Sequence, residues 1–181
     1  MIGTIEEKAV KIHLLCAVAL GLAGSATAAS AQTSININSS VPAYCSALTP
    51  PAGPLSLGVF AEADGRLPDA FPTAATYSVD GYYCNMPSKV TILATPLMNT
   101  APGTYDPAVY SAKIDYSADL VWGGLSGAET SLDGTASELL VPTAHIGTFA
   151  LTFSAPSTAG DIRPLAGAYS GTVSLTVAFN P

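Results

Sequence analysis

The sequence has little charge, few basic residues and few histidines. Only 10% of the 181 residues are charged, and six Lys and Arg stand against thirteen Asp and Glu, which gives a net charge of -7. Binding to nucleic acid phosphates requires clustered positive charge, so we expect no nucleic acid partner. The two histidines, His13 and His145, exclude the paired-histidine metal motifs, and we expect no metal and no cofactor.

Long apolar runs are also nearly absent. The one apolar run covers residues 14–23, about half of the roughly 20 residues that a membrane-spanning helix needs. We therefore expect no membrane span. Disorder is excluded as well, because 49% of the residues are hydrophobic and disordered chains are poor in such residues.

The N-terminal segment is typical of a secretory signal peptide. Lys8 and Lys11 precede the apolar run, and the small residues after it end in Ala29-Ser30-Ala31, an A-x-A cleavage pattern. Ala26-Thr27-Ala28 is a competing cleavage site. We expect residues 1–31 to be the signal peptide and residues 32–181 to be one exported domain, since roughly 100–200 residues make one domain.

Cysteine is scarce, and its count is informative. Removal of the signal peptide removes Cys16 and leaves Cys45 and Cys84. Two cysteines in an oxidising compartment are expected to form one disulfide. A redox or metal-binding pair is the alternative, which the lack of a C-x-x-C motif and of further histidines disfavours.

No segment has a sustained helical period, whereas two-residue alternation is frequent. It occurs over residues 35–45, 55–59, 77–84, 90–95, 114–120 and 149–153, and most regularly over 173–179. Alternation of this kind predicts strands with one buried face. Many short strands separated by turn residues predict an all-β fold, an antiparallel sandwich or barrel.

Catalytic patterns are not visible. Gly167-Ala168-Tyr169-Ser170-Gly171 has its serine one place off the G-x-S-x-G spacing, and it precedes a predicted strand where the nucleophile motif precedes a helix. The scattered aspartates have the spacing of turns and solvated faces. We expect no enzymatic activity.

The order of features resembles the spore coat protein U family, which includes subunits of archaic chaperone–usher pili. The resemblance rests on Ser34–Asn38 leading to Cys45, on Gly81-Tyr82-Tyr83-Cys84, and on the tail Ala166–Phe179, similar to A-G-x-Y-x-D-x-V-x-V-x-V-x-Y/F. Gly171 departs from that pattern, and Asn180-Pro181 extends past it.

The resemblance implies an incomplete, pilin-type immunoglobulin-like sandwich and assembly by donor-strand exchange. The donor would include Ile35 and Ile37, and the acceptor edge strand would carry Val173, Leu175, Val177 and Phe179. The partners would be a periplasmic chaperone, an outer-membrane usher and neighbouring pilin subunits, identical or different. The protein would pass through the periplasm to the cell surface or be secreted, and would serve adhesion or biofilm formation.

Two alternatives stay open. Ile35 and Ile37 could begin the domain's own first strand. The protein could also be a self-contained periplasmic or secreted β-sandwich that binds a ligand through its loops.

Overall fold

The computed structural model describes residues 33–60 and 62–180, so the predicted signal peptide lies outside the described residues. The chain divides between Ser39 and Ser40 into two compact units. In the first unit, residues 33–39 contain no strand, and Ile35 and Ile37 are 81% and 89% exposed.

The regular secondary structure of the second unit is almost entirely β-strand. Its elements are β1 (Thr76–Cys84), β2 (Ser88–Ala94), β3 (Leu97–Asn99), β4 (Tyr110–Ser111), β5 (Lys113–Trp122), β6 (Leu125–Thr130), β7 (Ser137–Val141), β8 (His145–Ser157), the 3₁₀ turn η1 (Ala159–Asp161), β9 (Arg163–Pro164), β10 (Tyr169–Ser170) and β11 (Val173–Phe179). The described part of the chain has no helix with the length and hydropathy of a membrane span.

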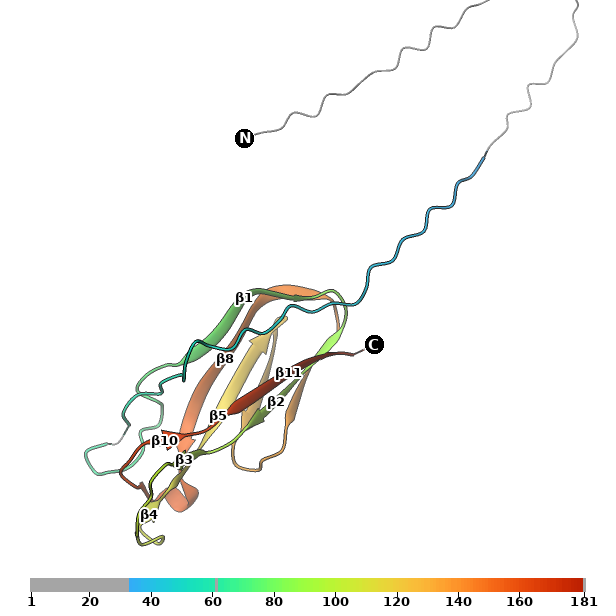
Figure 1. The fold of residues 1–181 in the computed structure, drawn as a ribbon. Helices are drawn as coiled ribbons and strands as arrows, with labels where there is room; N and C mark the ends of the chain where they lie inside the picture. Colours follow the sequence, from blue (N-terminus) through green and yellow to red (C-terminus); the bar gives the residue numbers. More distant parts are fainter. Residues whose placement is uncertain (1–32, 61, 181) are drawn as a thin grey trace, which may run out of the picture. The chain divides into compact units, whose positions relative to one another are not determined.

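The strands form two facing antiparallel sheets (Figure 1). The larger has the order β1-β8-β5-β3-β10, with β6 also paired to β5, and the smaller has the order β11-β2-β7. A short parallel pair, β4 and β9, lies at one end of the unit. The sheets curl toward each other as a half-barrel, so the all-β sandwich expected from the sequence is confirmed.

Two aromatic groups fill the space between the sheets. Tyr82, Trp122 and Phe149 are fully buried, with ring centroids 5.2–6.1 Å apart. In the second group, Tyr116 lies 5.9 Å from Phe153. The inward faces of β2 and β5 supply the aliphatic core between them, as the alternation of residues 90–95 and 114–120 predicts.

The predicted strands over residues 35–45 and 55–59 are wrong for this structure. Within those ranges the only pairing is an isolated bridge between Cys45 and Cys84. Alternation indicates that a segment can present one apolar face. A strand forms only where a neighbouring strand supplies backbone hydrogen bonds. The strand β6 was missed because its Ser/Gly-rich sequence has the composition of a loop.

A bulge in β1 changes which side chains face the core. Pairing with β8 shifts register between Val79 and Tyr82, where Gly81 adopts a φ of 66°. The extra residue moves Tyr82 inward and Tyr83 outward, as a bulge does. Simple alternation along residues 77–84 therefore fails at Gly81.

A tyrosine secures the turn before β11. The Tyr169 hydroxyl donates to the Leu165 carbonyl oxygen at 2.6 Å, and it lies 3.1 Å from the Ser111 carbonyl oxygen. A tyrosine bonded to the backbone a few residues upstream of its own strand is a feature of immunoglobulin-like sandwiches. Gly167 lies inside this turn, where an added Cβ would come within 2.5 Å of the Asn99 amide nitrogen.

Candidate functional site

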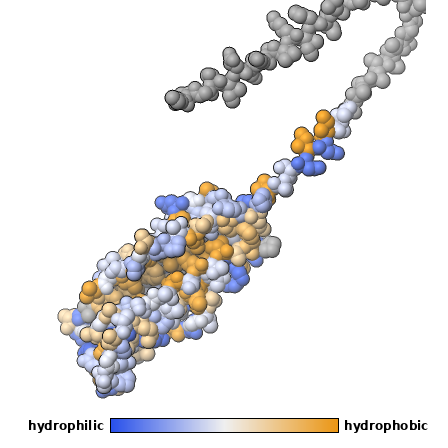
Figure 2. All heavy atoms as spheres, in the orientation of Figure 1, coloured by the Kyte–Doolittle hydropathy of each residue, from blue (hydrophilic) through white to orange (hydrophobic). Residues whose placement is uncertain are grey.

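A large apolar groove of about 1390 Å³ lies beside β11 in the second unit. It opens between β11 and the non-strand segment 48–60, and its floor is formed by residues of β1, β5 and β8. In Figure 2, hydrophobic side chains gather in a band across the middle of this face. The groove is therefore an open section of the core.

The first wall of the groove is the edge strand β11. It pairs with β2 from Val173↔Ala94 to Phe179↔Ser88, and no described strand pairs with its other edge. Val173 and Leu175 line the groove and are half-buried. A strand with one unpaired edge offers a row of backbone donors and acceptors to another strand.

The second wall is the segment 48–60, which has no regular pairing. Leu48, Leu57 and Phe60 pack against the core. Thr49 accepts a 2.8 Å hydrogen bond from the Tyr77 hydroxyl at its carbonyl oxygen. Pro50 and Pro51 also line the groove, and proline is suited to a segment outside a sheet ladder because it has no N–H to donate.

The floor of the groove is mostly aromatic. Tyr77, Tyr116, Leu151 and Phe153 line it. Burial raises the pKa of Tyr116 to about 12 and also raises that of Tyr77, because both environments disfavour the charged phenolate. The floor is suited to apolar side chains.

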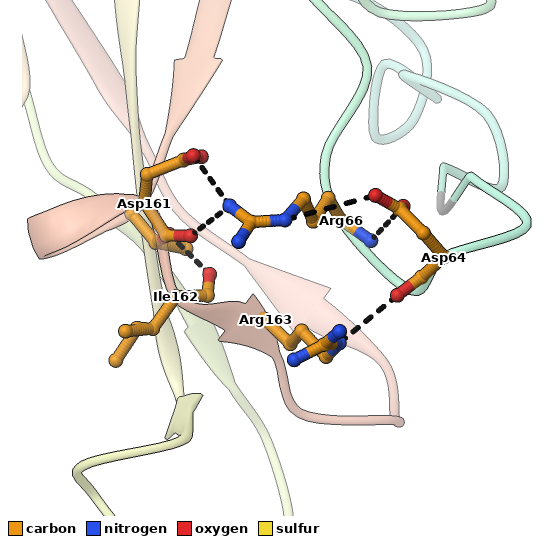
Figure 3. Close-up of polar contacts among 6 residues, drawn as sticks. Asp64, Arg66, Asp161, Ile162 and Arg163 are labelled. Carbon is orange, nitrogen blue, oxygen red and sulfur yellow. Dashed lines mark hydrogen bonds and ion pairs between the residues drawn. The ribbon is translucent and has the colours of Figure 1, made fainter.

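A charged cluster borders one end of the groove (Figure 3). The Arg66 guanidinium donates to the Asp161 carbonyl oxygen at 2.7 Å and pairs with its carboxylate. Arg163 donates from Nε to the Asp64 carbonyl oxygen at 2.9 Å. These contacts join loop 62–66 to the turn around η1, although each ion pair is solvent-exposed and contributes little alone.

At the opposite end, residues 42–46 are fastened to the end of β1. The Asn85 side chain accepts from the Tyr44 amide at 2.8 Å and donates to the Pro42 carbonyl oxygen at 2.8 Å. The predicted disulfide between Cys45 and Cys84 is confirmed, with a Cα–Cα distance of 4.0 Å. The segment is thus held where it enters the second unit.

The residues singled out from the sequence fall in three places. Val173 and Leu175 line the groove, Val177 is half-buried farther along β11, and Phe179 is 43% exposed near its end. Ile35 and Ile37 belong to the first unit, whose placement relative to the groove is not described. Their role as a donor stays a prediction.

Sequence reasoning missed most of the groove. Segment 48–60 was interpreted as a proline-rich break followed by a strand, and no pattern placed it opposite β11. Tyr77, Tyr116 and Phe153 were recognised as strand residues, but alternation cannot tell a floor residue from a core residue. The one available sequence signal is the apolar/polar alternation of residues 173–179, which predicts a half-buried strand but not the groove beside it.

The groove offers hydrophobic contact and, at the edge of β11, backbone hydrogen bonding. Among the described residues, no three or more His, Cys, Asp and Glu side chains lie close enough together to hold a metal ion. His145 lies away from the groove, with its ring 5.8 Å from that of Trp122. The arrangement is suited to binding an extended peptide.

A comparison with models of known protein families finds no match, and a comparison with curated proteins finds none either.

Proposed function

We propose that the protein is a structural subunit of a surface fibre, assembled by donor-strand exchange and serving adhesion or biofilm formation. The observation that carries the proposal is the edge of β11 without a described partner, lying beside an apolar groove. Strand addition to such an edge combines backbone hydrogen bonds with side-chain pockets on alternate residues.

The predicted donor matches the groove in period and chemistry. Ile35 and Ile37 would point to one face of an added strand, because side chains alternate along a strand. Val173 and Leu175 have the same spacing on β11 and face the groove. Asn36 and Asn38 would lie on the opposite, solvated face.

The resemblance to spore coat protein U adds the partners. A periplasmic chaperone would cover the groove after export, an outer-membrane usher would guide assembly, and the N-terminal segment of a neighbouring subunit would then replace the chaperone. Head-to-tail donation is a heterologous contact, so it would build an open filament.

A peptide-binding experiment tests the proposal. The acceptor is the mature chain, residues 32–181, carrying Ile35→Asp and Ile37→Asp, which removes its ability to donate. Since both isoleucines are exposed, the substitutions should leave the second unit folded. A synthetic peptide of residues 32–40 should raise the acceptor's melting temperature in a concentration-dependent way.

Two control peptides separate insertion from simple hydrophobic adhesion. A peptide with Ile35→Asp and Ile37→Asp should not bind. A peptide with Asn36→Asp and Asn38→Asp carries the same charge change on the solvated face and should still bind. An acceptor that is stable and indifferent to all three peptides would reject strand donation and favour the self-contained ligand-binding domain.

A further inference from the structure

A second apolar surface lies at the end of the unit where residues 42–46 are fastened. We define it as the junction patch: Val41, Tyr44, Tyr83 and Ile146. Val41 is 83% exposed and Ile146 is 68% exposed, and both tyrosines are also exposed. Tyr83 and Ile146 are register partners on β1 and β8, and the rings of Tyr44 and Tyr83 are 5.6 Å apart.

The junction patch has a shape that can receive another surface. Tyr83, Cys84, Ala144, His145 and Ile146 line a shallow hollow of about 320 Å³. Tyr44 cannot leave the patch easily, because its amide is bonded to Asn85 and the next residue is in the disulfide. Exposed apolar side chains gathered on one rigid surface are typical of interaction sites.

If the proposed donor-strand exchange holds, the short stretch of chain between Ile37 and Val41 limits what can cover this patch. Val41 follows Ile37 by four residues, a span of at most about 13 Å at 3.3 Å per residue. When the groove of an acceptor copy holds Ile37 of the donor copy, the surface of the acceptor must therefore lie close to the donor's junction patch. No room for a flexible linker is left between them.

The direction of the inserted strand identifies the facing surface. An antiparallel addition to β11 is favoured, since it continues the antiparallel sheet. The end of β11 adjoins the β1–β2 connection, as Asn180 N–H bonds to the Pro87 carbonyl oxygen. An antiparallel donor consequently leaves the groove at the other end, where Tyr110 and Arg163 line it.

We infer that the junction patch of one copy packs on the groove end of the next, around Val109, Tyr110 and Arg163. Val109 and Tyr110 are each 39% exposed and offer apolar surface there. Arg163 has no carboxylate partner within salt-bridge distance among the described residues, and a guanidinium packs favourably on a tyrosine ring. The inference rests on the proposed function and adds a second contact beside the donor strand.

The test compares whole-chain donors with the free peptide on one acceptor. The acceptor is the immobilised mature chain carrying Ile35→Asp and Ile37→Asp, and dissociation rates are measured. A wild-type whole-chain donor should dissociate about 10-fold or more slowly than the peptide of residues 32–40, because it buries the junction patch as well. A donor with Val41→Ser and Ile146→Ser should lose that advantage.

A matched variant controls for general hydrophobic association. Leu140→Ser removes a similarly exposed side chain, 52% exposed, from the outer face of β7, and this donor should dissociate as the wild type does. Melting temperatures of the free donors check that each one is folded.

Each outcome decides a different point. Equal dissociation of the wild type and the Val41→Ser/Ile146→Ser donor overturns the junction contact and leaves strand donation intact. A failure of both the peptide and the wild-type chain to bind overturns the proposed function, and the junction contact with it.

Discussion

The Tyr169 hydroxyl donates to the Leu165 carbonyl oxygen at 2.6 Å and thereby fixes the turn from which β11 starts. Because β11 forms one wall of the groove, the position of this wall depends on a hydrogen bond four residues upstream of Tyr169 itself.

Tyr169→Phe should destabilise the fold by about 0.5–1.5 kcal/mol, the usual net contribution of an intramolecular hydrogen bond, here partly buried. Chemical denaturation of the mature chain measures the change in the free energy of unfolding. Tyr110→Phe is the control, since Tyr110 is 39% exposed and its hydroxyl makes no described hydrogen bond. Equal losses in both variants would show that the Tyr169 hydroxyl has no special role.

Gly167→Ala should also destabilise, by about 1–3 kcal/mol, the usual cost of forcing a methyl group into a packed site. The new Cβ would come within 2.5 Å of Asn99 Nδ2, and Gly167 has a φ of 148°. Gly53→Ala is the matched control because an added Cβ there meets no atom within 4 Å. A Gly167→Ala protein as stable as Gly53→Ala would contradict the packing at Asn99.

Replacing both cysteines, Cys45→Ala and Cys84→Ala, should cost about 3–4 kcal/mol in the chain-entropy account of a loop of this size. The bond joins residues separated by 39 positions. Unfolding in urea should shift to lower concentration, and reductant should shift the wild type but not the variant. A wild type insensitive to full reduction would contradict this prediction.

Alkaline pH should weaken the fold through Tyr116, whose folded pKa is raised to about 12 by burial. Between pH 10 and 12 the unfolded chain releases this proton while the folded chain keeps it, so the free energy of unfolding falls as pH rises. Tyr77, Tyr82 and Tyr169 act in the same direction.

Tyr116→Phe should therefore make stability less dependent on pH in that range without removing the dependence. Urea unfolding at several pH values between 9 and 12 measures the slope for the variant and the wild type. Parallel curves would mean that the Tyr116 phenol is not held neutral in the groove floor.

Much of the sheet structure could be predicted from the sequence, and the exceptions have physical causes. Residues 90–95, 114–120 and 173–179 form strands as expected, because their alternation coincides with one buried face. Residues 35–45 have the same alternation but no strand. The alternation shows only that a segment could pair as a strand. Whether it does so depends on whether the tertiary structure places another strand beside it.

The candidate site was less predictable than the fold. Cysteine count alone predicted the Cys45–Cys84 bond, since there was one possible pair in residues 32–181. The groove brings together segment 48–60, β5, β8 and β11, which are far apart in sequence. Only the tertiary arrangement places Leu57 and Leu175 on opposite walls.

The disulfide has a mechanical consequence if copies are joined through residues 33–40. Tension along a filament would enter each copy at Pro42 and Tyr44 and reach Cys45 at once. From there a covalent bond passes the force to the end of β1, an edge strand of the larger sheet. Because the bond bypasses the chain between Cys45 and Cys84, tension applied through residues 33–40 would not unravel the segment that forms one side of the groove.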